Sequence, residues 1–165
     1  MLKEILINEF LHEAENTRKL LKAIPDSALN WRPTERNWTT AELAAHVIGI
    51  YDWYIPVLTL TEFKLETHHY DRGDIRTATG LSTKFEDNVA KAQKALEAFD
   101  EAKIQDLWKM TLDGKEIIPA TPRLAVVRNV LCNHLYHHRG ELVVYLRLTG
   151  NKVPGLYGPS ADDKK

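Results

Sequence analysis

The chain has 165 residues, of which 44% are hydrophobic and 27% charged, as is usual for one globular domain. Its formal net charge of −1 gives no general electrostatic case for binding nucleic acid or an anionic membrane surface. A single cysteine excludes an internal disulfide, and no apolar run reaches the length of a membrane span. We therefore expect a cytoplasmic protein with one domain over residues 1–158 and a disordered tail over residues 159–165.

Two helices are predicted in the first part of the chain. Apolar residues at helical spacing predict the first over about residues 2–24, and the Pro-Asp pair that follows ends it. A second helix begins after Thr39, because Thr39 and Glu42 fit a capping box. This helix continues through a mostly apolar stretch, in which we expect Pro56 to cause a kink or an early end.

A long connection and a third helix follow. Residues 64–81 are polar and lack a sustained period, so they predict a crossover or a functional loop. Residues 85–99 carry an apolar seam that alternates by four and three, which predicts a helix. Farther on, the Asp113-Gly114 pair between short apolar pieces predicts a small hairpin.

The last predicted helix is the one richest in histidine. Thr121-Pro122 predicts its N-cap and first residue, and Gly150 predicts its end. Four helices with one long connection predict an all-α fold, a four-helix bundle with a short hairpin before the last helix.

Three histidines are predicted to point into the interior of this bundle. On a helical wheel, His134 and His138 lie about 40° apart within the apolar stripe of the fourth helix. His46 lies within about 60° of several apolar residues of the second helix. A buried imidazole needs partners for its ring nitrogens, and one divalent metal ion supplies a partner to all three rings. The pattern favours a metal site, and a purely structural histidine core is the alternative.

Other polar residues of these helices and of the connection are expected at the surface. His137 lies at the border of the apolar stripe, and His68 and His69 lie in the polar connection. Arg139 points away from the stripe, which predicts an exposed side chain. Cys132 lies on the side of the helix opposite to the paired histidines, so we do not expect it to be a ligand or a nucleophile.

A few neighbours of the three histidines are candidates for supporting roles. Glu141 lies about 20° from His134 on the wheel and could orient a ligand or accept a proton, although an ordinary surface position explains it equally well. Trp53 and Tyr145 could line a binding pocket, although a core position explains both.

At these residues the chain resembles the DinB-like family of four-helix bundles, which includes the bacillithiol transferases and has relatives among mycothiol-dependent enzymes. The family pattern is one histidine on the second helix, then His-x-x-x-His followed by Arg-Gly-Gln/Glu on the fourth. It maps onto His46, His134 and His138 as the metal triad. The matching stretches are LNWRPTERNWTTAELAAHV at 29–47, TPR at 121–123 and NHLYHHRGELVVYLRLTGNKVPGLYG at 133–158.

The resemblance implies a fold, a cofactor and a partner. It implies an up-down-down-up bundle in which the 64–81 connection joins two roughly parallel helices, and it implies a homodimer. It also implies one divalent metal ion, with zinc, nickel, manganese and iron among the metals of relatives. The resemblance alone, and no pattern in the residues, further implies that Tyr157 in the tail closes the site.

The resemblance also implies a reaction class. In the thiol-transferase relatives, the metal activates a low-molecular-weight thiol that attacks an electrophile, and in hydrolase-like relatives a metal-activated water would attack the substrate. We therefore predict an enzyme that transfers a bacillithiol-like thiol or hydrolyses a small-molecule substrate, with no nucleic-acid or membrane partner. The alternative is a non-catalytic, stress-related dimeric module that binds a metal or a ligand.

Overall fold

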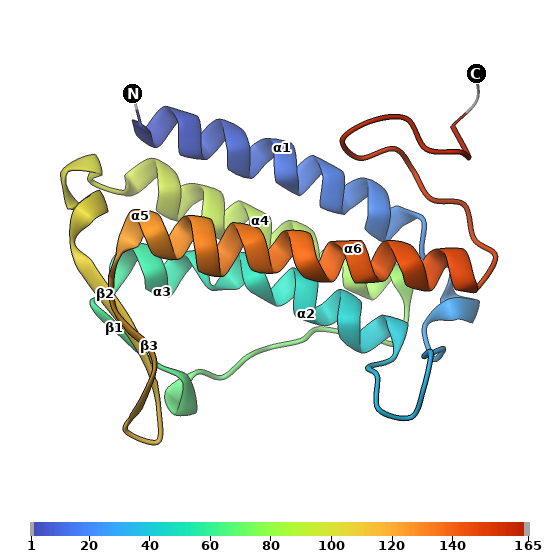
Figure 1. Ribbon diagram of the computed structural model, residues 1–165, viewed down its shortest axis with the longest axis horizontal. Coiled ribbons are helices and arrows are strands. Elements are labelled where there is room, and N and C mark those ends of the chain that lie inside the picture. The colour runs from blue at the N-terminus through green and yellow to red at the C-terminus, as the bar shows by residue number, and fades with distance from the viewer. Residues whose placement is uncertain (1, 164–165) are drawn as a thin grey trace.

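Four long helical segments lie side by side in the computed structural model, which describes residues 2–163 (Figure 1). The predicted four-helix bundle is therefore confirmed. The helices are α1 (Leu2–Lys22), α2 (Thr40–Asp52), α3 (Tyr54–Thr59), α4 (Ala78–Ala98), α5 (Arg123–Ala125), the π-helix η4 (Val126–Cys132) and α6 (Asn133–Leu148), with short 3-10 turns η1 (Asp26–Ala28), η2 (Leu65–Thr67) and η3 (Glu101–Gln105).

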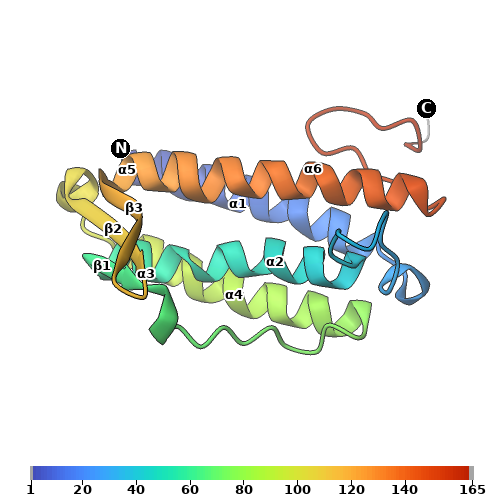
Figure 2. The ribbon, with the colours of Figure 1, turned by 60° about the horizontal axis from the view of Figure 1, so that its bottom comes forward.

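The order of the helices follows the up-down-down-up arrangement (Figures 1 and 2). The helices α2 and α4 run in the same direction, and α1 and α6 run opposite to both. The connection between α3 and α4 therefore has to return along the length of the bundle, and it does so beside α2 (Figure 1). This geometry places a polar segment of the chain next to the helix that carries His46.

The core lies between the helices, and each helix contributes a stripe of apolar side chains to it. In α4 this stripe has the predicted spacing, and its members are almost fully buried: Leu81, Phe85, Val89, Ala92 and Leu96. Burying one such large side chain contributes about 1.5–3 kcal/mol. Periodic burial of this kind accounts for the rotation of each helix about its own axis, because each stripe has to face the neighbouring helices.

The second helical segment begins and breaks where the sequence predicts. Thr39 Oγ1 accepts from the Glu42 backbone N–H at 3.2 Å, and Glu42 Oε2 accepts from the Thr39 backbone N–H at 2.8 Å, which completes the capping box. The helix is interrupted at Trp53, between α2 and α3. Pro56 explains the break, because it has no N–H and its ring would clash with the carbonyl group of Asp52.

The predicted hairpin is present and belongs to a small sheet. Strands β2 (Leu107–Leu112) and β3 (Lys115–Pro122) are antiparallel, and the residues between them, Asp113 and Gly114, have φ values of 49° and 74°. Positive φ at both positions is the requirement of a type I′ hairpin turn. A third strand, β1 (Glu62–Lys64), pairs with β2 in parallel and was not predicted, because three residues cannot display a strand period.

The fourth helical segment begins later than predicted. Thr121 and Pro122 belong to β3, and the helix starts at Arg123, so the prediction of Thr121 as N-cap was wrong. Pairing with β2 extends through Pro122 and holds both residues in the strand. Arg123 is buried and donates to the Leu60 carbonyl oxygen at 2.6 Å, which ties this start to the end of α3. The helix ends at Leu148, and Gly150 just beyond it has a φ of 72° and stops it as predicted.

A π-helical stretch lies inside this segment and was not predicted. It covers η4, and a wheel with a constant step of about 100° cannot represent its wider turn. Regular α-helix resumes at Asn133. The relation between His134 and His138 therefore keeps the predicted α-helical geometry.

The structure describes most of the C-terminal segment that was predicted to be a disordered tail. Residues 164–165 of the predicted disordered tail lie outside the described residues, and the boundary at 158 stays a prediction. Within the described part, Asp162 accepts a hydrogen bond from the Val153 backbone N–H at 2.9 Å and pairs with Arg147. Among the described helices, none combines the length and the apolar character that a membrane crossing requires.

Candidate metal centre

Three half-buried histidines meet between α2 and α6. His46 comes from α2, and His134 and His138 come from successive turns of α6. One nitrogen of each ring lies within 4.8 Å of the others, and His46 Nε2 is 3.0 Å from His134 Nε2. The ring of His138 has its centroid 4.5 Å from that of His46 and 4.6 Å from that of His134. The three side chains predicted to form a triad are therefore brought together.

The donor set of this triad fits a divalent ion. Two nitrogen ligands at about 2.0–2.1 Å from a tetrahedral ion lie roughly 3.3 Å apart, close to the separation of the His46 and His134 nitrogens. In the absence of an ion, a hydrogen bond between these two nitrogens requires that one of them is protonated and donates to the other. Imidazole ligands suit several first-row metals, so the donor set is compatible with zinc, nickel and iron alike.

The surroundings of the triad favour the neutral form of its rings, which is the form that binds metal. Burial lowers the pKa of His46 to about 4, and the charges of His138 and His134 add to this effect. Burial also lowers the pKa of His134, and the charge of His138 acts in the same direction. Both rings are therefore available as lone-pair donors at neutral pH.

We expect the metal-free protein to lose stability as the pH falls from about 6.5 toward 4. In this range the unfolded chain protonates His46 while the folded chain does not, so the unfolded state binds more protons and stability decreases with decreasing pH. Thermal unfolding of metal-free protein across this range measures the effect. A His46→Gln variant should show a weaker pH dependence, and an unchanged one would contradict the role of His46.

Glu141 lies where it can orient one of the three histidines. Its Oε2 atom is 2.7 Å from His138 Nδ1. A proton on Nδ1 donated to this carboxylate leaves the lone pair on Nε2 for a metal ion, an arrangement that is common around histidine ligands. His137 lies 3.5 Å from the other Glu141 oxygen with 65% of its side chain exposed, which matches its predicted place beside the triad.

Two tryptophans enclose the triad, and one of them was missed by the sequence analysis. The Trp38 ring centroid is 4.7 Å from that of His46 and 5.8 Å from that of His138. Trp53, which was a candidate, lies 6.0 Å from the His134 ring. The position of Trp38 just before the N-cap, where an apolar side chain often folds back over the first turns, was the signal that could have identified it.

The two candidate tyrosines, Tyr145 and Tyr157, lie outside the cavities next to the triad. Tyr145 is buried, donates to the Trp38 carbonyl oxygen at 3.2 Å and packs edge-on against Trp31. Tyr157 is 65% exposed, and its hydroxyl donates to Glu13 Oε2 at 2.7 Å. Neither tyrosine is among the residues lining the two cavities next to His46.

Arg139 is buried, so its predicted place at the surface was wrong. Only 1% of it is exposed, and its guanidinium pairs with the Glu13 carboxylate of α1 and donates to Thr17 Oγ1 at 3.1 Å. The helix α6 therefore has two buried faces, one toward α2 with the histidines and one toward α1 with Arg139. A single apolar stripe on a wheel does not reveal the second face, because its buried group is charged.

Two cavities adjoin the triad, and both include His46. One of about 120 Å³ is lined by Trp38, Glu42, His46, Tyr70 and Arg72. The other, of about 170 Å³, lies between α2 and the returning connection and has mostly apolar walls.

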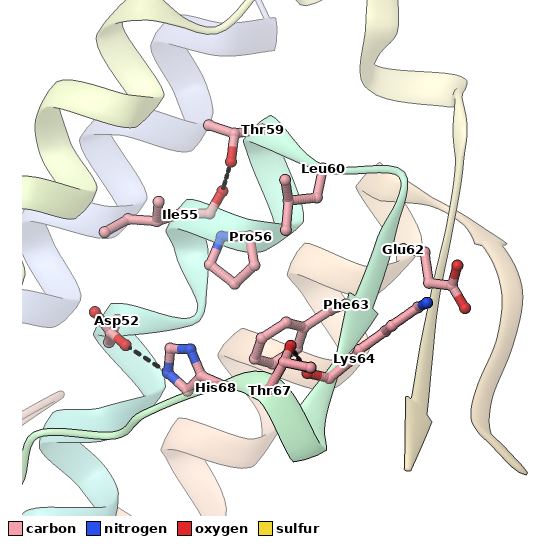
Figure 3. Close-up of a pocket in the computed structure, with 10 residues that line it drawn as sticks. All are labelled: Asp52, Ile55, Pro56, Thr59, Leu60, Glu62, Phe63, Lys64, Thr67 and His68. Carbon is pink, nitrogen blue, oxygen red and sulfur yellow. Dashed lines mark hydrogen bonds and ion pairs between the residues drawn. The ribbon is translucent and has the colours of Figure 1, made fainter. Parts of the chain in front are cut away.

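A larger cavity of about 490 Å³ lies beside α3 and β1, and no triad histidine is among its lining residues (Figure 3). His68 lines both this cavity and the apolar one next to His46. The predicted solvated position of His68 was wrong, since only 22% of its side chain is exposed. Its Nε2 atom is 3.0 Å from Asp52 Oδ2, and Figure 3 shows the two side chains facing each other.

Comparison with known sequences agrees with this geometry. A family model described as the DinB family matches residues 1–165. The protein YrdA of Bacillus subtilis strain 168, described as uncharacterized, is 26% identical over 167 residues, which cover 92% of this chain and 85% of that protein.

Comparison with solved structures supports the same fold. A DinB-like protein from Bacillus cereus has a TM-score of 0.74 at 21% identity, with 93% of this chain and 97% of that chain covered. YfiT from Bacillus subtilis has a TM-score of 0.59 at 16% identity, with 90% and 87% covered. YfiT is described as a probable metal-dependent hydrolase with an unusual four-helix bundle topology.

Proposed function

The chain belongs to the DinB family, and we propose that it is an enzyme in which His46, His134 and His138 hold one divalent metal ion. The observation that supports this most directly is the convergence of three half-buried imidazoles from two helices next to two cavities. Structural zinc sites usually have four protein ligands, whereas catalytic sites keep a position open. Within the described part of the chain, the triad offers three ligands.

The protein side chains have distinct parts in such a site. When bound, a divalent ion acts as a Lewis acid and lowers the pKa of a water or thiol at its open position. Glu141 Oε2, 2.7 Å from His138 Nδ1, would accept a proton held on that nitrogen and so orient the ring with Nε2 toward the ion. Trp38 and Trp53 pack against the rings of His46 and His134 and cover part of their surface.

Two nucleophiles are compatible with this site. The description of YfiT supports hydrolysis, in which the nucleophile is water. The resemblance of the histidine motifs to those of bacillithiol transferases supports transfer of a low-molecular-weight thiol to an electrophile. A protein thiol is excluded from this role in the described structure, because Cys132 is only 3% exposed and burial raises its pKa. A thiol would therefore have to be a co-substrate.

An activity panel on the metal-loaded protein tests the proposal. One arm contains a monochlorobimane-type electrophile with several low-molecular-weight thiols, and the other contains activated esters and amides in water. We expect turnover in one arm, reduced at least about 100-fold by His134→Ala and unchanged by His137→Ala, because His137 lies outside the triad. Absence of turnover across the panel would instead favour the non-catalytic module that binds a metal or a ligand.

The homodimer, the cytoplasmic location and the identity of the metal among zinc, nickel, manganese and iron stay predictions. They rest on the resemblance and on composition.

A further inference from the structure

We propose that the apolar cavity of about 170 Å³ beside His46 binds an aromatic ring of the substrate, so that the substrate is a small aryl compound with its reacting group next to the ring. This inference rests on the proposed function, because it places the ring beside the metal triad. It adds a substrate class, which the triad alone does not define.

The walls of the cavity offer apolar and aromatic surface. They come from α2 on one side and from the returning connection on the other: His46, Gly49, Ile50, Trp53, Leu65, His68 and Tyr70. The polar groups of the connection are already bonded elsewhere, since Tyr70 donates to the Ala45 carbonyl oxygen at 2.6 Å and His68 pairs with Asp52. A ligand in this cavity is therefore recognised by apolar contact.

The volume of the cavity selects a single ring. A dry protein cavity of about 150 Å³ is sufficient to bind benzene, and this cavity has about 170 Å³. A fused two-ring system needs more room. His68 lines both this cavity and the larger one and pairs with Asp52, so a longer substituent that reached from one cavity into the other would have to displace His68.

The outer wall depends on a glycine in α2. A Cβ atom at Gly49 would lie 2.3 Å from Tyr70 Oη and 2.5 Å from its Cζ, so any other residue displaces Tyr70. Tyr70 holds the connection against α2 through its bond to Ala45. The cavity thus exists because the chain has no side chain at position 49.

Binding of hydroxamates to the zinc-loaded protein tests the inference without requiring turnover. Hydroxamates chelate divalent metals, so acetohydroxamate reports the metal alone and benzohydroxamate adds one phenyl ring. By calorimetry we expect benzohydroxamate to bind about tenfold or more tightly than acetohydroxamate, from burial of the ring. We expect 2-naphthohydroxamate to show no further gain.

A matched pair of variants connects this gain to the cavity. Gly49→Ala should reduce the ratio of benzohydroxamate to acetohydroxamate affinity to less than about threefold, because Tyr70 is displaced. The zinc content should stay unchanged. Gly140→Ala on α6 is the control, since an added Cβ there meets nothing within 4 Å. Leu65→Ala, which removes part of the outer wall at a half-buried position in η2, outside the bundle helices, serves as a second variant if Gly49→Ala does not fold.

The outcomes separate the inference from the proposed function. Equal affinity of the two smaller hydroxamates for zinc-loaded protein would overturn the aryl site and leave the metal site intact. Failure to bind zinc would overturn the proposed function. In that case fluorobenzene binding to the metal-free protein, followed by ¹⁹F NMR, decides the aryl site: broadening that Leu65→Ala abolishes supports it, and no broadening overturns it.

Discussion

Replacing His134 and His138 together by alanine is expected to reduce the bound divalent metal from about one ion per chain to a level near zero. The double variant retains only His46 of the triad, and a single imidazole does not hold a divalent ion against dilution. Elemental analysis of protein purified without a histidine tag measures the effect. Retention of stoichiometric metal in the double variant would refute the triad as the metal site.

The control for this experiment removes two histidines that lie outside the triad. His69 and His137 are exposed, and their joint replacement by alanine should leave the metal content unchanged. Chelation of the wild-type protein gives a second measure. At a free metal concentration of 100 times Kd, binding contributes about 2.7 kcal/mol, which corresponds to a decrease of about 5–10 °C in Tm on chelation. A purely structural histidine core predicts no change in Tm.

Replacing Arg139 by methionine is expected to lower the free energy of unfolding by about 3–5 kcal/mol. The Glu13 carboxylate, of which only 8% is exposed, loses its ion-pair partner and remains buried beside Thr17. Urea unfolding of the metal-free protein measures the loss. Replacing Glu13 by leucine in the same chain should recover most of it, because a buried ion pair can often be replaced by apolar residues without net cost.

An exposed ion pair provides the comparison for this prediction. Arg76 pairs with Asp74 at 2.8 Å, with 85% of the Arg76 side chain exposed, so Arg76→Met should leave the unfolding midpoint unchanged within error. If Arg139→Met had an equally small effect, the buried pair would not stabilise the fold. The pair also bears on the site, because Arg139 follows His138 directly and its bond to α1 fixes the rotation of α6.

The local elements and the triad were accessible from the sequence. The capping box at Thr39 and Glu42, the turn at Asp113-Gly114 and the helix end at Gly150 are each set by the backbone preferences of a few neighbouring residues. The inward direction of His46, His134 and His138 follows from helical periodicity, because each histidine shares a stripe with apolar residues. Such patterns operate over one or two turns, so they can be read without knowing the fold.

Contacts between distant segments were decided by the tertiary structure alone. Arg139 is buried because Glu13, more than a hundred residues earlier, supplies its counter-charge. His68 leaves solvent because the returning connection brings it to Asp52, and Tyr70 docks on α2 because Gly49 leaves room for it. No local period encodes these partners. Local patterns therefore encode the four helices and the inward direction of the three histidines, whereas the packing of the helices and the connection sets what surrounds those histidines.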